Sequence, residues 1–202
     1  MKLYHSPKAI NPERVVNFLR LKGQLDAVTI EEVSIMALEH RQPDYQALSP
    51  YSQVPVLVLE DGTAITESRA ICTYFEALYP EPNLMGGDAR EKGLIEMWDR
   101  RVEFMMLMNF AQWFRNTHPA MAELEKPQLP EAGAKAEANL KSFVASVDRH
   151  LASGDWLAAG RFSIADLTLY LCCGFAGVMR WKPHQEWPHL GAHHARVAEQ
   201  LA

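Results

Sequence analysis

One short stretch of the chain combines several groups suited to binding a small charged molecule. Within residues 49–78, a Val54-Pro55 pair opens an apolar run, and a tight Asp-Gly turn then leads to Glu67-Ser68. Val54 can offer its backbone N–H and C=O, because an extended segment pairs with a peptide as an added strand does. Glu67 and Ser68 stand where a helix is expected to begin, and the first N–H groups of a helix bind anions. This order of features suits the binding of a small anionic peptide.

The elements that must position these residues alternate between strand and helix up to about residue 79. Strand patterns cover residues 2–5, 27–33, 56–59 and 63–66, and the last two flank a hairpin turn. A helix is expected to begin at Asn11-Pro12, with Asn as the N-cap, and an irregular helix to cover 36–48. A further helix follows Ser68 and is expected to bury one apolar face: Ile71, Tyr74, Phe75 and Leu78.

Beyond this region the sequence predicts helices only. Tyr79–Asp88 concentrates Pro, Gly and Asn, which indicates a linker. The predicted domains are therefore 1–79 and 89–202, joined by 80–88. A long helix running toward residue 118 is expected to use Leu94, Trp98, Val102 and Met105 as its apolar face. Another helix is expected to use Leu140, Phe143, Val144, Val147 and Leu151. Ser163 and Asp166 predict a capping box, and a last helix is expected near Pro188.

Composition narrows the possible partners and the compartment. The 202 residues are 48% hydrophobic and 22% charged, as in ordinary globular proteins. A net charge of −5 argues against nucleic acid or an anionic membrane as partner. No run is long and apolar enough to span a bilayer, and prolines 7 and 12 interrupt the start of the chain, so we expect no signal peptide. Three cysteines, two of them adjacent, form no disulfide framework, which favours the cytoplasm.

Three motifs in this order resemble the cytosolic glutathione transferases over nearly the whole chain. They are Gln53–Leu57 (QVPVL), an Asp-Gly turn leading to Thr66–Ile71 (TESRAI), and Phe162–Asp166 (FSIAD). The resemblance implies an α/β, thioredoxin-like N-terminal domain with a mixed four-stranded sheet, an all-α C-terminal domain and a homodimer. It also implies glutathione as co-substrate, no metal, and a cis peptide bond at Pro55.

Glutathione carries two carboxylates, an amine and a thiol, so its site needs several distinct contacts. Ser68 and Gln53 match positions for the γ-glutamyl end, with Glu67 as counter-charge to the amine. Val54 would pair with the cysteinyl residue. The expected glutathione-binding residues are His40, Arg41, Gln53, Val54, Glu67 and Ser68, the first two facing the glycyl carboxylate. Simpler interpretations stay open, namely an ordinary helix start at 66–68 and a solvated turn at 40–41.

The residue that stabilises the thiolate is harder to assign, because a free thiol has a pKa of about 8.5. Family members use a Tyr, Ser or Cys near the first strand or helix, but the serine position of the theta, phi and zeta classes falls on Ala9. Asn11 matches the asparagine of nu-type bacterial members, and its amide could lower the thiol pKa at a helix N-terminus. It could equally be a plain N-cap. Tyr4 and Ser6 are the other candidates, although core and turn roles suit them better. We therefore expect a nu-like or unassigned bacterial class.

The second substrate is expected to be a small apolar electrophile, bound between the domains. The Met- and aromatic-rich stretch 103–115 supplies the candidate pocket residues Met105, Met106, Asn109 and Trp113. The same stripe could instead be core or dimer interface. Arg100 and Arg101 could reach the partner subunit's glutathione or form a solvated face.

The remaining reactive side chains predict no further chemistry. Cys72, Cys172 and Cys173 lie in apolar helical patterns, which favours buried inert thiols. His189 and His193 are spaced i, i+4, but no acidic or Cys ligand accompanies them in the sequence, so no metal site is expected. The expected function is conjugation of the glutathione thiolate to electrophiles, a detoxification reaction. Glutathione-dependent disulfide or peroxide reduction at the same site, or a non-catalytic interaction module, are the alternatives.

Overall fold

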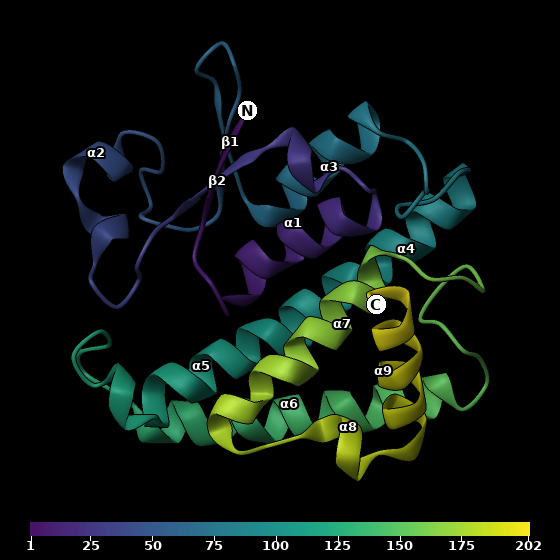
Figure 1. The fold of residues 1–202 in the computed structure, drawn as a ribbon. Helices are drawn as coiled ribbons and strands as arrows, with labels where there is room; N and C mark the ends of the chain where they lie inside the picture. The colour runs from purple at the N-terminus through teal and green to yellow at the C-terminus, as the bar shows by residue number, and fades with distance from the viewer. The chain divides into compact units, whose positions relative to one another are not determined.

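The computed structural model describes residues 1–202 and divides them into two compact units. The first comprises Met1–Leu84 and the second Met85–Gln200. The first unit combines a sheet with helices, and the second is entirely helical (Figure 1). None of the helices has the length and apolar character needed to cross a membrane.

The first unit is built on a mixed four-stranded sheet, as the sequence predicts. Its strands are β1 (Lys2–His5), β2 (Thr29–Glu32), β3 (Val56–Val58) and β4 (Ala64–Thr66), in the order β2-β1-β3-β4. β1 and β2 run parallel, whereas β3 is antiparallel to both β1 and β4. Leu3 and Leu57 are fully buried and anchor the sheet in the core. The Val54-Pro55 peptide bond just before β3 is cis, as the resemblance implies.

Two helices, α1 (Ile10–Leu21) and α3 (Ser68–Leu78), pack against each other in this unit (Figure 1). The connection from β2 carries shorter turns, η2 (Glu39–Arg41) and α2 (Pro43–Gln46). Ile71 and Phe75 are fully buried, as predicted for α3, but Leu78 is 46% exposed and its predicted burial is wrong. Leu78 is the last residue of the helix, and the ring of the following Tyr79 stacks on Phe75 in its place.

The predicted start of α1 is two residues too late. Ala9 is the N-cap, so Asn11 is the second residue of the helix and not its cap. Lys8, at φ 67, turns the chain into an extended Ala9 before the helix begins. Pro12 is tolerated as the third residue, because the first N–H groups of a helix have no intrahelical partner for proline to remove.

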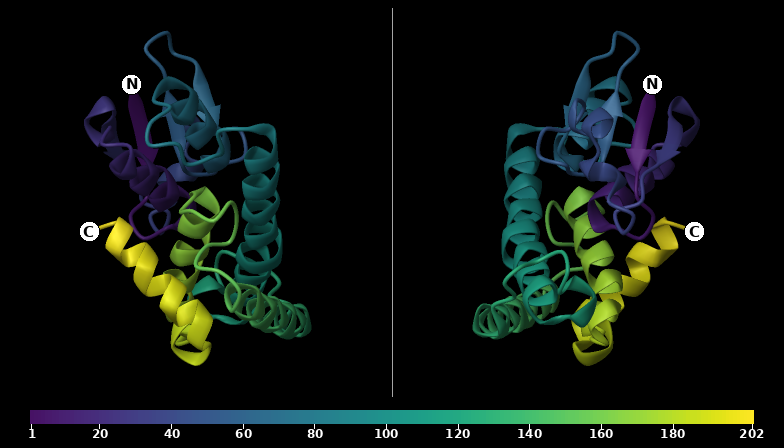
Figure 2. Two further views of the ribbon diagram at one scale, coloured as in Figure 1. Left: turned by 90° about the vertical axis from the view of Figure 1, so that its right-hand side faces the viewer. Right: turned by 90° about the vertical axis from the view of Figure 1, so that its left-hand side faces the viewer.

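The second unit begins with a single long rod made of three segments (Figure 2). These are α4 (Ala89–Arg101), a π-helical stretch η3 (Val102–Leu107) and α5 (Met108–Thr117). The remaining helices are α6 (Pro130–Leu151), α7 (Ile164–Phe175), α8 (Pro183–Glu186) and α9 (Pro188–Gln200). The predicted capping box is present, since Asp166 accepts from both the backbone N–H and the hydroxyl of Ser163. The last helix begins at Pro188 as predicted.

The buried side of the rod lies one residue away from most of the predicted apolar face. Val102 is fully buried as predicted, but Met105 is 46% exposed and Met106 is 1% exposed in its place. Ile95 and Asp99 are also fully buried, whereas the predicted Leu94 and Trp98 are only partly buried. The predicted apolar face is therefore wrong by one residue at Leu94, Trp98 and Met105, and the difference begins in α4, before the π stretch.

Candidate functional site

The segments that carry the predicted binding residues all leave the sheet at one edge. β1 and β2 are parallel, so both end there, and their last residues His5 and Glu32 are paired. β3 begins and β4 ends at the same edge, because Val56 pairs with both Tyr4 and Thr66. Four connections therefore meet at this edge: residues 6–11, 33–41, 52–55 and 67–68. They contain every residue predicted to bind glutathione, together with Asn11.

Each of these connections holds one non-glycine residue in the left-handed region of backbone conformation. Lys8, Leu38, Ser52 and Glu67 have φ values of 67°, 61°, 54° and 64°. The chain has only six such residues, so four of them gather at this edge. A left-handed residue with a Cβ costs about 1–2 kcal/mol, and such costs concentrate at binding and catalytic sites. The edge is therefore the part of the first unit where the backbone is held away from its preferred conformations.

Asn11 and Ser68 meet across this edge. The Ser68 hydroxyl donates a hydrogen bond to Asn11 Oδ1 at 3.3 Å, which joins the first turn of α1 to the first residue of α3. Ser68 is 4% exposed, and no side chain caps either helix. Because the amide oxygen of Asn11 is engaged, its NH2 group points away from Ser68. The positive ends of two helices and one amide donor thus lie together.

The loop before the cis proline is fixed by hydrogen bonds to the backbone of Gln53. Ser49 Oγ accepts from Gln53 N at 3.1 Å and donates to Gln53 O at 3.0 Å, and the Tyr45 hydroxyl also donates to that oxygen at 2.9 Å. Burial, with a contribution from Tyr4, raises the pKa of Tyr45, so it remains a proton donor. The sequence analysis did not assign roles to Ser49 or Tyr45. The Ser49-Pro50 pair, a turn signal, is the only hint of the first.

These contacts decide which backbone groups face a ligand. Both backbone groups of Gln53 are engaged within the protein, so strand-like pairing with a bound peptide falls to Val54. The side chain of Gln53 is exposed and the side chain of Val54 is half-buried.

His40 and Arg41 differ sharply in their surroundings. His40 is 8% exposed, and burial, with a smaller effect from Arg41, lowers its pKa, so it is neutral near pH 7. Arg41 is exposed. The positive charge that the sequence analysis assigned to this pair therefore resides on Arg41.

Tyr4 lies on the other face of the sheet from the buried Leu3 and His5, since side chains alternate along a strand. Its ring stands edge-on to Tyr45 at 5.8 Å and packs on the small core of Val33, Tyr45 and Val56. Ser6 is buried, and its carbonyl accepts from Ala9 N in the turn before α1. Neither residue joins the Asn11–Ser68 contact. Tyr4 packs in a small core and Ser6 lies in a turn, the simpler of the roles considered for them from the sequence.

The four candidate acceptor residues separate into two kinds. Met106 and Trp113 are 1% and 8% exposed and belong to the core of the helical unit. Met105 is 46% exposed, and Asn109 is partly exposed. Phe104 and Met108, which the sequence analysis did not select, are 59% and 50% exposed beside them.

The remaining reactive groups are engaged elsewhere. All three cysteines are free and buried, as expected, and burial raises the pKa of Cys173 well above its usual value. His193, fully buried, lies with Nε2 2.9 Å from Asp166 Oδ1, so the expectation that no acidic residue accompanies it is wrong. Asp166 comes from the start of α7, a separation that sequence spacing does not reveal. That oxygen also accepts from Leu157 N at 2.9 Å. No three His, Cys, Asp or Glu side chains form a group that could hold a metal ion.

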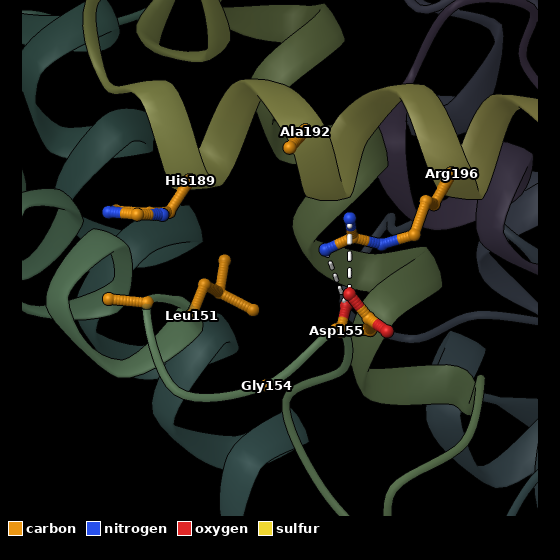
Figure 3. Close-up of a pocket in the computed structure, with 7 residues that line it drawn as sticks. Leu151, Gly154, Asp155, His189, Ala192 and Arg196 are labelled. Carbon is orange, nitrogen blue, oxygen red and sulfur yellow. Dashed lines mark hydrogen bonds and ion pairs between the residues drawn. The ribbon is translucent and has the colours of Figure 1, made fainter.

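A shallow cavity of about 280 Å³ lies in the helical unit, between the end of α6 and α9 (Figure 3). Arg196 lines it, but its guanidinium is already paired with the carboxylate of Asp155 at 3.2 Å and with the carbonyl of Asp155 at 3.1 Å. None of the predicted binding or catalytic residues lines this cavity.

Comparisons with known proteins agree with this arrangement. Residues 3–83 match the profile of the glutathione S-transferase N-terminal domain, and residues 104–200 match that of the C-terminal domain. Glutathione S-transferase 2 of Saccharomyces cerevisiae is 30% identical over 201 residues, which cover 99% of this chain and 86% of the yeast protein. The crystal structure of a glutathione S-transferase domain-containing protein from Marinobacter aquaeolei VT8 is 34% identical, with a TM-score of 0.94 over 100% of both chains.

A third relative matches over a shorter region. Maleylacetoacetate isomerase of Pseudomonas aeruginosa is 40% identical over 99 residues, which cover 46% of this chain and 46% of that protein. The two domain matches span both structural units, and the yeast relative covers nearly the whole sequence. The chain therefore belongs to the glutathione S-transferase family of enzymes.

Proposed function

We propose that this enzyme binds glutathione at the sheet edge, lowers the pKa of its thiol with Asn11, and transfers the thiolate to the electrophilic carbon of a small apolar substrate. The sulfur forms a bond to that carbon, the leaving group departs with the electron pair, and the thiol proton passes to solvent. The enzyme would act as a cytoplasmic homodimer of the nu-like bacterial type, in detoxification.

The contact between Ser68 and Asn11 is the observation that carries this proposal. It brings the uncapped ends of α1 and α3 together and leaves the Asn11 amide N–H free of the Ser68 hydroxyl. A thiolate beside a helix N-terminus and an amide donor is stabilised relative to the thiol, which lowers the pKa. Because Asn11 is not the cap of α1, it has no structural duty as a cap that would compete with this role.

Four further groups would hold the rest of the tripeptide. Ser68, through the backbone N–H groups at the N-terminus of α3, suits the γ-glutamyl carboxylate, and the exposed Glu67 suits the amine. The backbone of Val54 suits the cysteinyl residue. Arg41 suits the glycyl carboxylate as an exposed cation. Gln53 and His40 lie in the same two connections, Gln53 as an exposed side chain and His40 as a neutral one.

The acceptor would meet the exposed apolar side chains of the π stretch and the start of α5. We name Phe104, Met105 and Met108 the acceptor patch. Methionine side chains are flexible and polarisable, so they adapt to apolar molecules of irregular shape. Met106 and Trp113 would support the patch from within the core.

A second candidate function is reduction of disulfides or peroxides by glutathione. Ala9 favours it, because it occupies the position of the serine that supports conjugation in the theta, phi and zeta classes, and it has no hydroxyl. In that reaction the thiolate attacks the glutathione sulfur of a glutathione-capped disulfide, the new bond gives oxidised glutathione, and the other thiol leaves and takes up a proton.

Calorimetric titration of the protein with glutathione tests both functions. If glutathione does not bind at millimolar concentration, both functions are rejected. With binding established, rates with a chlorinated dinitrobenzene and with a glutathione-capped disulfide distinguish conjugation from reduction. Sedimentation of the purified protein tests the homodimer.

A further inference from the structure

The π stretch between α4 and α5 leaves one backbone carbonyl without its regular partner. The N–H of Met108 bonds to the carbonyl of Glu103, five residues earlier. When the next N–H resumes the spacing of four residues, it bonds to Met105 and passes over the carbonyl of Phe104. Phe104 is 59% exposed, so without a protein donor this carbonyl would bond to water, and a donor from the protein would fix the turn more firmly.

The side chain of Asn109 supplies that donor. Its Nδ2 lies 2.9 Å from the carbonyl oxygen of Met105 and 3.4 Å from that of Phe104. Asn139 Nδ2 lies 3.5 Å from Asn109 Oδ1, which orients the amide with its NH2 group toward these carbonyls. The amide therefore contacts the carbonyls of Phe104 and Met105, where the helix returns from i+5 to i+4 hydrogen bonds.

Two other asparagines show that this double contact is specific to the π turn. Asn17 in α1 and Asn116 in α5 also donate to the helix backbone, but each reaches only the carbonyl four residues earlier, at 2.8 Å and 2.9 Å. Only Asn109 extends to the carbonyl five residues earlier. Its second contact therefore follows from the local change in helix type.

The other end of the π stretch is fixed by charge. Arg100 bonds to Asp99 at 2.9 Å and also pairs with Glu103, inside the π stretch. Asp99 is fully buried and accepts from the Thr168 hydroxyl at 2.6 Å, which ties the start of the stretch to α7. At the C-terminal end of the π stretch, the hydrogen bonds of Asn109 have the same role. Asn109 follows Met108, a residue of the acceptor patch.

We propose that Asn109 is a positioning residue for the electrophilic acceptor. Its amide bonds to the carbonyls of Phe104 and Met105, so it fixes the backbone that carries two of the three exposed side chains of the acceptor patch. Without the extra residue of the π turn, the side chains ahead of the buried Phe110 would rotate by about 100°, one α-helical residue. The acceptor patch would then lose its present arrangement. This inference rests on the proposed conjugation reaction and names the residue that sets its acceptor specificity.

Steady-state kinetics of Asn109→Ala test the inference, with acceptor and glutathione varied separately. The KM for the chlorinated dinitrobenzene should rise about 3- to 10-fold, the effect of one net hydrogen bond on the turn. The KM for glutathione and the thiol pKa should stay within about 2-fold and a few tenths of a unit. Asn109→Ser retains a donor for Met105 but is too short for Phe104, so it should be intermediate. Ser146→Ala is the matched control, because Ser146 donates to a carbonyl of the regular helix α6.

Hydrogen exchange read by mass spectrometry gives an independent result on the turn itself. Amides of residues 103–109 should exchange faster in Asn109→Ala than in the wild type and in Ser146→Ala. Unchanged exchange and an unchanged acceptor KM in Asn109→Ala overturn the inference. Equal increases in both KM values also overturn it, since they indicate general destabilisation. If wild-type protein binds no glutathione, the proposed function fails, while the exchange result still decides whether Asn109 holds the turn.

Discussion

Replacing Asn11 with alanine should raise the pKa of the thiol of bound glutathione. The substitution removes the amide donor and leaves the helix in place, because Ala9 is the cap of α1. Alanine also has the highest helix propensity, so no loss of helix is expected from the change itself. Only the interaction with the sulfur should be lost.

The size of the shift follows from the two groups that lie at this position. A hydrogen bond to a charged group contributes about 1.5–3 kcal/mol, and sulfur, a weak acceptor, belongs at the lower limit. About 1.5 kcal/mol corresponds to about one pKa unit. The N-terminus of α1 remains and is worth about 0.3–1 kcal/mol, so the bound thiol should stay below the pKa of free glutathione. The Ser68–Asn11 bond, at 3.3 Å, is longer than the usual O–H···O bond of about 2.8 Å, so Ser68→Ala should shift the pKa by less than half a unit.

Ultraviolet absorbance of the thiolate, followed against pH at saturating glutathione, measures this pKa directly. The midpoint of kcat/KM against pH should move upward by the same amount, because the reactive thiolate then requires a higher pH. Arg41→Ala is the control, since loss of a distant cation should weaken binding and leave the midpoint nearly unchanged. A titration curve for Asn11→Ala that superimposes on the wild type refutes the assigned role of Asn11.

Three further predictions concern the stability of the two units. Lys22 Nζ lies 2.5 Å from a carboxylate oxygen of the largely buried Glu76. Lys22→Met leaves that carboxylate without its cation, so it should lower the free energy of unfolding by about 3–5 kcal/mol. Adding Glu76→Gln should recover much of that loss in urea denaturation. Burial lowers the pKa of His194 to about 4 from 6.5, so the unfolded state binds more protons below pH 6.5. Stability should therefore fall by at most about 2 kcal/mol by pH 5, a loss that His194→Gln should largely abolish. A Cβ at Gly133 would lie 2.5 Å from a methyl group of α5, so Gly133→Ala should lower stability by about 1–3 kcal/mol. Gly93→Ala, with no atom within 4 Å of its Cβ, should raise the thermal midpoint slightly, since alanine favours helix.

Local patterns predicted most elements of the fold because their signals are contiguous in sequence. The hairpin around Asp61-Gly62 and the capping box at Ser163 each depend on residues a few positions apart. The three errors in the fold have a different origin. The start of α1 depends on the left-handed Lys8, the exposure of Leu78 on the ring of Tyr79, and the buried face of the rod on its packing against α6 and α7. None of these is encoded in a regular hydrophobic period, because each depends on backbone conformation or on contacts with other segments.

The sequence predicted the residues of the candidate site that stand in a recognisable motif. It did not predict the residues that only hold the backbone of another residue. Gln53 and Val54 stand in a recognisable run, whereas Ser49 and Tyr45 act only on the backbone of Gln53. Their role follows from the closing of a loop, which residue types do not reveal. The neutral state of His40 likewise depends on burial by neighbours distant in sequence.

The convergence of four separate connections on one sheet edge has a consequence for how this enzyme can diversify. Affinity for the tripeptide would depend on the segments around residues 41, 54 and 68, while reactivity would depend on residues 9–11. A substitution in the last segment can then exchange one chemistry for another without rebuilding the binding surface. Ala9→Ser, for example, would add a hydroxyl at the cap of α1, and a designer or natural selection could explore such changes one residue at a time.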